Sequence, residues 1–171
     1  MFPRLRLSFI MLTAGLLLLS ACGFQLRGRT TLPFSTLYVQ APALSPFALQ
    51  LKRAVQSGSS TRIIERADQA EAVLQILQEL QEKEILSLGA GGRVREFQLR
   101  YRVAFRVHDG KGGEFVPVST VQLTREVSFN DTDVLAKETE EALLFRDMQF
   151  DMVQLIMRRL AAAQRPKPAA Q

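Results

Sequence analysis

Residues 97–108 read Phe-Gln-Leu-Arg-Tyr-Arg-Val-Ala-Phe-Arg-Val-His, and an apolar side chain occupies every second position of this stretch. Successive side chains of a β-strand point to opposite faces, so this period of two predicts a strand with one buried face. Aromatic and β-branched residues at the apolar positions favour the same structure, and a helix does not produce such an alternation. The stretch therefore predicts a long strand that covers a hydrophobic core on one side.

The segment after this strand predicts a long antiparallel hairpin. Residues 109–113 read Asp-Gly-Lys-Gly-Gly, and glycine suits the positive φ angles of a tight turn. Arg125 falls on the apolar side of the return strand and is expected at a margin of the sheet. The other side chains of that face are expected to point inward, namely Val121, Leu123, Val127 and Phe129.

The residues before the hairpin predict two short strands and a helix. The strands are expected at residues 36–40 and 61–65, and the helix begins with Pro46 behind the capping residue Ser45. Residues 70–88 are ambiguous. Their Ala, Glu, Gln and Leu content favours a helix slightly, whereas the spacing of the leucines also fits a strand.

A second, longer helix is predicted after the hairpin. Capping candidates at residues 130–133 precede it, and its apolar stripe continues to about Ala163. Its acids lie in the N-terminal half, and Arg158 and Arg159 lie near its C-terminus, as the helix dipole favours. Residues 164–171 contain two prolines and are expected to be disordered.

The N-terminus is typical of a secretory signal. Arg4 and Arg6 precede an apolar run at residues 7–19, which is shorter than the roughly 20 residues that a membrane-spanning helix needs. The stretch Leu-Ser-Ala-Cys at residues 19–22 resembles the lipobox of bacterial lipoproteins, in which the cysteine is acylated and becomes the mature N-terminus. The alternative is an ordinary signal peptide with a chance cysteine.

The lipobox resemblance implies that Cys22 carries an S-diacylglycerol and an N-acyl chain. Each CH₂ group that enters the membrane contributes about 0.8 kcal/mol, so several chains hold a protein firmly on a membrane surface. Gly23 follows the cysteine in place of the aspartate that retains lipoproteins in the inner membrane. The expected location is therefore the periplasmic face of the outer membrane.

The composition excludes several classes of protein. Cleavage before Cys22 leaves 150 residues with 20 basic and 17 acidic side chains, a balance too even for a nucleic-acid-binding protein. The single cysteine permits no intramolecular disulfide, so stability has to come from the hydrophobic core. With one histidine, no Cys/His cluster and no phosphate-binding glycine loop, we expect neither an enzyme nor a metal site or other cofactor.

The polar face of the central strand carries three arginines, Arg100, Arg102 and Arg106. Their guanidinium groups suit phosphate or carboxylate ligands if this face of the sheet is open. The alternative is cross-strand pairing with acids on the neighbouring strands. The acids in question are Glu82, Glu84 and Glu126.

Four short motifs, in order along the chain, resemble the LptE family of lipopolysaccharide-assembly lipoproteins. They are Cys-Gly-Phe-Gln-Leu-Arg-Gly at 22–28, Glu-Phe-Gln-Leu at 96–99, Pro-Val-Ser at 117–119, and the stretch from Phe-Asn at 129–130 to Leu-Ala-Lys at 135–137. The resemblance implies an α+β two-layer sandwich, in which a four-stranded mixed sheet carries two helices on one face. The implied order, strand-helix-strand-strand-strand-helix, places a strand at the ambiguous residues 70–88.

These expectations divide the chain into four parts. They are the signal peptide at 1–21, a lipidated tether at 22–34, a single domain at 35–163 and the tail at 164–171.

The resemblance also implies a function. A member of this family sits as a plug in the lumen of the LptD β-barrel of the outer membrane, assists its assembly, and binds lipopolysaccharide during delivery to the outer leaflet. One basic contact residue of the family corresponds to Lys137, and Arg93 is the basic residue nearest to a second. The alternative is a structural outer-membrane lipoprotein that serves as the scaffold of another periplasmic assembly, without lipopolysaccharide recognition.

Overall fold

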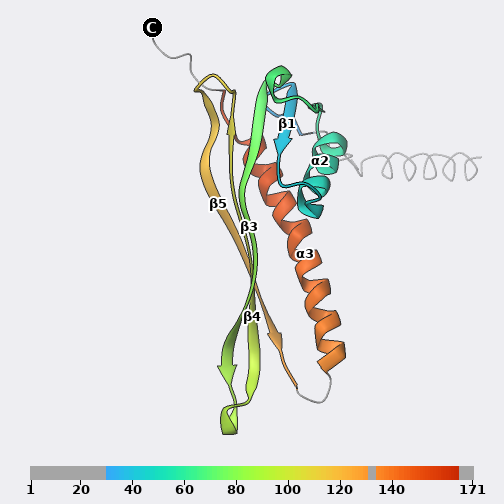
Figure 1. The fold of residues 1–171 in the computed structure, drawn as a ribbon, viewed down its shortest axis with the longest axis vertical. Coiled ribbons are helices and arrows are strands. Elements are labelled where there is room, and N and C mark those ends of the chain that lie inside the picture. The colour runs from blue at the N-terminus through green and yellow to red at the C-terminus, as the bar shows by residue number, and fades with distance from the viewer. Residues whose placement is uncertain (1–29, 131–133, 166–171) are drawn as a thin grey trace, which may run out of the picture.

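The computed structural model describes residues 30–130 and 134–165, which form one twisted sheet with two helices on one of its faces (Figure 1). The strands are β1 (Thr36–Gln40), β2 (Arg62–Ile63), β3 (Ala72–Leu88), β4 (Val94–His108) and β5 (Glu114–Ser128), and the helices are α2 (Pro46–Gly58) and α3 (Val134–Ala161). In the sheet order β2-β1-β3-β4-β5, β1 runs parallel to both of its neighbours and the remaining pairs are antiparallel. The predicted α+β fold with a mixed sheet is confirmed, including the strand at residues 70–88.

The sheet has five strands rather than the predicted four. The additional strand, β2, is two residues long and pairs with Thr36 and Leu37 of β1. Backbone hydrogen bonds hold both ends of this pairing, from Arg62 N to Ser35 O and from Ile64 N to Leu37 O. The chain then leaves the sheet and forms a short 3₁₀ turn at Ala67–Gln69, which is why the strand predicted at 61–65 is cut to its middle.

The core lies between the helices and the inner face of the sheet. β4 shows the predicted alternation, because all of its inward side chains from Leu99 to Val107 are buried. Phe47 of α2 packs edge to face on Tyr101, with ring centroids 6.2 Å apart. Burial of one such side chain stabilises the fold by about 1.5–3 kcal/mol, so β4 contributes much of the stability.

A bulge at Leu77 explains why β3 was ambiguous in sequence. Ile76 pairs with Phe105, but the next pair is Gln78 with Ala104, so β3 carries one extra residue at this point. Such an insertion shifts every later side chain to the opposite face. Leu80 consequently lies beside Arg102 on the outer face, although its spacing from Leu74 had placed both on one side.

The return strand β5 begins at Glu114, earlier than its alternation predicted. Phe115 and Val116 are buried in the core, and the register shifts where Phe105 pairs with Ser119 and Val107 pairs with Val116. This irregularity surrounds Pro117, which donates no backbone hydrogen bond. The alternation of buried and exposed side chains in β5 therefore changes register at this irregularity. Only the part after it forms a regular pattern in the sequence.

Both ends of the domain extend beyond the predicted limits of 35 and 163. Leu32 and Phe34, which had been assigned to the tether, are buried in the core, and the Phe34 ring packs edge to face on Phe115 at 5.3 Å. Arg165, assigned to the tail, donates to Pro33 O at 2.9 Å and lies 3.4 Å from Glu71.

Several predictions fall on residues that the structure does not describe. These are the signal peptide, Cys22 and the tether up to residue 29, the helix caps at 131–133, and residues 166–171 of the tail.

The two ends of the molecule differ in the number of helices that cover the sheet (Figure 1). We call residues 30–79, 101–121 and 148–165 the five-strand end, and residues 80–100, 122–130 and 134–147 the hairpin end. β3 has 17 residues, which span about 55 Å at the usual rise of a strand. Because β1 pairs with β3 no further than Gln75 and α2 lies over the same part of the sheet, the hairpin end consists of three strands and the first turns of α3.

Candidate functional site

The predicted ligand residues Lys137 and Arg93 both lie at the hairpin end. Lys137 is in the first turn of α3, and Arg93 precedes the first residue of β4. These two chain positions are at the same end of the long axis (Figure 1). The predicted lipidation site Cys22 lies outside the described residues.

Lys137 borders a small hollow between α3 and the ends of β4 and β5. Its Nζ lies 2.8 Å from Glu140 Oε2 and donates to Ser128 Oγ at 3.3 Å, and 23% of the side chain is exposed. The hollow has a volume of about 220 Å³. Because Lys137 is close to the N-terminus of α3, the positive end of the helix dipole adds to its charge. Lys137 is thus placed to meet an anionic group, in competition with Glu140.

Two aromatic rings and an ion pair form the inner wall of this hollow. The rings of Phe97 and Phe129 pack edge to face, with centroids 5.2 Å apart. Lys83 Nζ lies 4.2 Å from the centroid of the Phe97 ring and 2.5 Å from Glu141 Oε2. These contacts tie β3, β4 and α3 together at a point where the sheet has no second helix over it.

Arg93 lies at the tip of the β3–β4 hairpin and does not line the hollow of Lys137. Its backbone oxygen accepts a hydrogen bond from Gly89 N at 2.7 Å, which closes the turn. Gly91 and Gly92 have φ angles of 78° and 76°, a region that glycine enters without steric cost. Within the described residues the guanidinium of Arg93 forms no ion pair or hydrogen bond, and the residue is exposed. The turn therefore presents an unpaired cation at the hairpin end.

In the arginine row on the outer face of β4, Arg100 and Arg102 pair across the strands with Glu82 and Glu84, two of the acids that the sequence offered, whereas Arg106 pairs with no acid among the described residues. Arg100 donates two hydrogen bonds to Glu84, at 2.8 and 2.9 Å. Arg102 donates to Glu82 at 3.2 Å and to Gln122 at 3.3 Å, so the row is tied to both neighbouring strands. Arg106 donates to the amide of Gln75 at 2.7 Å. The acids of β3 thus neutralise Arg100 and Arg102 without an external ligand.

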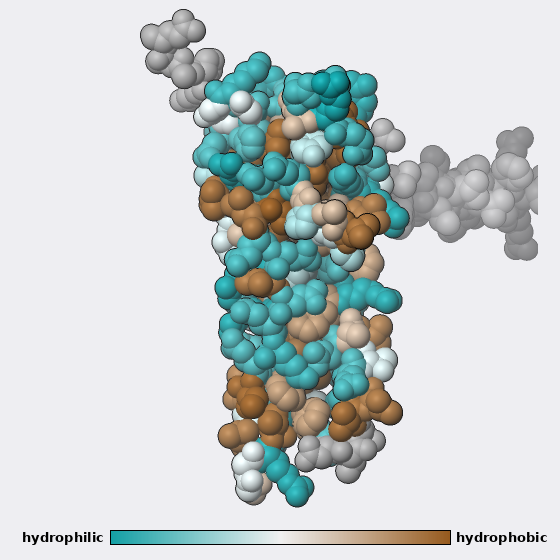
Figure 2. Space-filling view, in the orientation of Figure 1, coloured by the Kyte–Doolittle hydropathy of each residue, from teal (hydrophilic) through white to brown (hydrophobic). Residues whose placement is uncertain are grey.

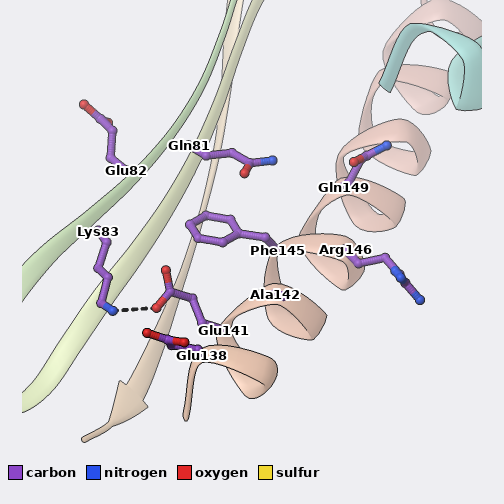
Figure 3. Close-up of a pocket in the computed structure, with 9 residues that line it drawn as sticks. All are labelled: Gln81, Glu82, Lys83, Glu138, Glu141, Ala142, Phe145, Arg146 and Gln149. Carbon is purple, nitrogen blue, oxygen red and sulfur yellow. Dashed lines mark hydrogen bonds and ion pairs between the residues drawn. The ribbon is translucent and has the colours of Figure 1, made fainter. Parts of the chain in front are cut away.

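The structure also forms a cleft that the sequence analysis did not identify. It lies between β3 and α3 at the hairpin end and has a volume of about 690 Å³ (Figure 3). Gln81 and Lys83 of β3 form one wall, and Glu138, Glu141 and Phe145 of α3 form the other. Pairing of Gln81 with Tyr101 puts these polar side chains of β3 on the helix-covered face, a consequence of the bulge that no sequence pattern revealed.

A hydrogen-bond network lies on the side of the cleft that faces the five-strand end. Glu79 accepts one hydrogen bond from Tyr101 Oη at 2.7 Å and another from Ser45 Oγ at 3.1 Å. Ser45 also caps α2 by accepting from Ala48 N at 3.1 Å. Burial of Tyr101, together with its hydrogen bond to the Glu79 carboxylate, raises the pKa of the phenol far above its usual value. The network joins β3, β4 and α2 and marks the point where α2 stops covering the sheet.

The part of the chain that the structure describes offers no group of three or more His, Cys, Asp or Glu residues able to hold a metal. His108 accepts a hydrogen bond from Gly110 N at 3.1 Å within the β4–β5 turn and therefore has a local structural role. Neither α2 nor α3 has the length and hydropathy that a membrane-spanning helix requires.

Comparison with known proteins identifies one family. Residues 34–160 match the sequence pattern of the lipopolysaccharide-assembly family LptE. Two curated relatives, each named LPS-assembly lipoprotein LptE, come from Photorhabdus laumondii and Pectobacterium atrosepticum. Both are 26% identical to this chain, over 160 and 161 residues, and the matches cover 92% of this chain and 86% of each relative.

Solved structures of bacterial lipoproteins have the same fold. The solution structure of lipoprotein B from Nitrosomonas europaea is 42% identical, with a TM-score of 0.71, over 82% of this chain and 91% of that one. The crystal structure of rare lipoprotein B from Shewanella oneidensis is 23% identical, with a TM-score of 0.65, over 74% of this chain and 94% of that one. The second similarity concerns the fold alone.

Proposed function

The chain belongs to the LptE family of lipopolysaccharide-assembly proteins, and from this we propose that it is an outer-membrane lipoprotein that binds the LptD barrel, plugs it and assists its assembly. We also propose that the protein binds lipopolysaccharide while the lipopolysaccharide is delivered to the outer leaflet. The observation that carries the proposal is the family match over residues 34–160. The geometry of the hairpin end adds a physical reason for each part of it.

The membrane anchor in this proposal is a lipid on Cys22. Thr30, the first described residue, bridges to Ser59 just beyond the end of α2, and its N–H donates to Gly58 O at 2.7 Å. The chain thus enters the fold at the five-strand end. Seven residues lie between Cys22 and Thr30, and the eight residue-to-residue steps that join the two span about 26–29 Å when extended. The anchor then holds the five-strand end near the membrane and leaves the hairpin end for its partners.

Lipopolysaccharide binding is supported by the mixture of charge and apolar surface at the hairpin end. Hydrophobic side chains gather there over both the hairpin and the start of α3 (Figure 2). Leu88 is 58% exposed and Leu135 is 80% exposed, and they belong to the same end as Arg93 and Lys137. Lipid A combines phosphates with acyl chains, so it matches cations that lie beside apolar surface.

The plug role is supported by the outer face of the sheet. Arg100 and Arg102 pair with acids of β3, and Arg106 donates to Gln75, which gives a hydrophilic face without a large excess of one charge. Such a face suits the polar interior of a large outer-membrane barrel. The partner is tested by purifying the tagged full chain from membranes in mild detergent. Co-purification of a large β-barrel is expected, and its absence would favour the alternative role as a scaffold of another assembly.

The lipopolysaccharide site is tested by reversing its two cations together, Lys137→Asp with Arg93→Asp. We expect binding to weaken by about tenfold or more, because two attractive charges become repulsive, and wild-type binding to weaken with added salt. The matched control is Arg62→Asp with Lys111→Asp, the same charge change at exposed positions of the five-strand end. Equal losses in both double variants would show a general effect of net charge and would remove the site from Lys137 and Arg93.

A further inference from the structure

We infer that the cleft between β3 and α3 binds the sugar part of lipopolysaccharide, an inference that rests on the proposed function and adds a second subsite to it. The cleft lies beyond the N-terminal end of α2, where that helix no longer covers β3. Ser45, the capping residue of α2, donates to Glu79 at 3.1 Å, and the next inward residue of β3, Gln81, is exposed. From Gln81 onward, no helix other than α3 faces the strand among the described residues (Figure 1).

The two walls of the cleft carry the groups that a sugar ring requires. Phe145 points from α3 toward the strands, and the amide of Gln81 points from β3 toward the helix (Figure 3). Below them, Glu138 lies beside the ion pair of Lys83 and Glu141. A ring with axial C–H groups can lie on the aromatic face, whose electron density is negative, while its hydroxyl groups reach the polar side chains.

These polar groups have unused hydrogen-bonding capacity. In the described residues, the side chains of Gln81, Glu138 and Arg146 form no hydrogen bond or ion pair. Gln81 offers an amide donor and acceptor, Glu138 offers acceptors, and Arg146 borders the cleft on α3 with its side chain pointing away from the strands (Figure 3). A polyhydroxylated ligand uses donors and acceptors together, so it matches this set better than a ligand that only accepts.

The same charges disfavour the other parts of lipopolysaccharide in this cleft. A phosphate would lie beside the carboxylates of Glu138 and Glu141. The nearby cation, Lys83 of β3, already forms an ion pair with Glu141. An acyl chain would find one aromatic ring among mostly charged and amide side chains, and burial of those polar groups without partners is costly. The volume of about 690 Å³ is that of a small-ligand site.

The cleft adjoins the hollow at Lys137. Lys83, Glu138 and Glu141 line both spaces. A molecule whose lipid A phosphates lie at Lys137 can therefore place an uncharged sugar of the attached core oligosaccharide between Gln81 and Phe145. Lipopolysaccharide has this order of groups, because its core oligosaccharide is joined to the phosphorylated lipid A.

The test uses three probes from one preparation of rough-type lipopolysaccharide: the intact molecule, the lipid A released from it by mild acid, and the core oligosaccharide released with it. Affinities are measured for the full chain in mild detergent. We expect intact lipopolysaccharide to bind about tenfold more tightly than lipid A, the contribution of one aromatic contact and a hydrogen bond or two. The core oligosaccharide alone should shift the side-chain amide resonances of Gln81 in NMR spectra.

The variant Phe145→Leu keeps an apolar side chain but removes the ring, and it should bring the two affinities close to equality. The matched control is Phe150→Leu, five positions along the same helix, where the ring is 53% exposed and does not line the cleft. It should leave the tenfold difference intact. The ratio of the two affinities is compared within each variant, so a partial loss of stability does not imitate the effect. Gln81→Ala, at an exposed strand position, is the second variant if Phe145→Leu does not fold.

Equal affinities of the wild-type chain for lipopolysaccharide and lipid A would overturn the sugar subsite and leave the proposed function in place. Equal reduction of the ratio by Phe145→Leu and Phe150→Leu would also overturn it. Loss of barrel co-purification in Phe145→Leu, with the ratio unchanged, would assign the cleft to a protein partner instead. If neither probe binds the wild-type chain, the proposed lipopolysaccharide binding itself fails.

Discussion

The five-strand end and the hairpin end are built from the same long strands but differ in how many of their apolar side chains are buried. Of the 27 buried apolar side chains in the described residues, Leu99 and Val127 alone lie at the hairpin end. That end instead exposes six of the eleven large apolar side chains that are open to solvent. They are Ile85, Leu86, Leu88, Val134, Leu135 and Leu143.

This difference separates stability from binding. The five-strand end has a second layer over all of its inner face, so its apolar side chains are removed from water and hold the fold together. The hairpin end has too little second layer to bury its apolar residues, and exposed apolar surface of this kind marks sites of interaction. We therefore expect substitutions at the five-strand end to change stability and substitutions at the hairpin end to change binding. Four measurements test this expectation.

The largest expected effect is that of Phe105→Ala at the five-strand end. Phe105 of β4 is fully buried, and the loss of its ring leaves a cavity that should cost about 3–5 kcal/mol of unfolding free energy. The control Ile85→Ala, at a position 57% exposed near the tip, should stay within about 0.5 kcal/mol. Urea unfolding of both variants measures the difference. Similar losses would mean that the hairpin end contributes to the core as much as the five-strand end does.

The second effect concerns the Tyr101–Glu79 hydrogen bond, at the boundary between the two ends. Because the folded state raises the pKa of Tyr101 above the usual 10.0, the native chain keeps the phenolic proton where the unfolded chain releases it. Stability from this group is complete below pH 10 and is lost as the pH rises, by roughly 1.4 kcal/mol per pH unit. Tyr101→Phe lacks this proton and should lose stability less steeply between pH 10 and 12. Parallel slopes for the two proteins would refute the assignment.

A smaller effect is expected from the ion pairs on the outer face of the sheet. Arg100 and Glu84 form two hydrogen bonds, but the side chain of Glu84 is 52% exposed. Water screens such a pair, so a double-mutant cycle with Arg100→Ala and Glu84→Ala should give a coupling below about 1 kcal/mol. The coupling should shrink at 1 M salt. A larger coupling that does not depend on salt would mean that these ion pairs have a structural role comparable to that of the core.

The smallest effect on stability is expected at the tip. Leu86→Ser and Leu88→Ser change side chains that are 42% and 58% exposed, and each should alter the unfolding free energy by no more than about 0.5 kcal/mol. Together they should nevertheless reduce the binding of an apolar fluorescent dye to the native protein, because exposed apolar surface is removed. Unchanged dye binding would place the apolar surface elsewhere on the molecule.

The amino-acid sequence was sufficient wherever one regular pattern continued without interruption. The alternation from Phe97 to Val107 predicted β4 and its buried face, Ser45 and Pro46 marked the start of α2, and the acids and arginines of α3 agreed with its direction. Arg93 and Lys137 lie at one end of the domain, because the strand after Arg93 pairs with the strand that leads into α3.

The tertiary structure decided the points that depend on register. The bulge at Leu77 turns Gln81 and Lys83 toward the helix and Leu80 away from it, and the register of β4 places Arg100 opposite Glu82 and within reach of Glu84. A single inserted residue reverses the faces of a strand, and its position depends on the partner strand rather than on local propensity. The sequence alone therefore determined which segments form the sheet, whereas the cleft and the pairing of the arginines follow from how those segments align.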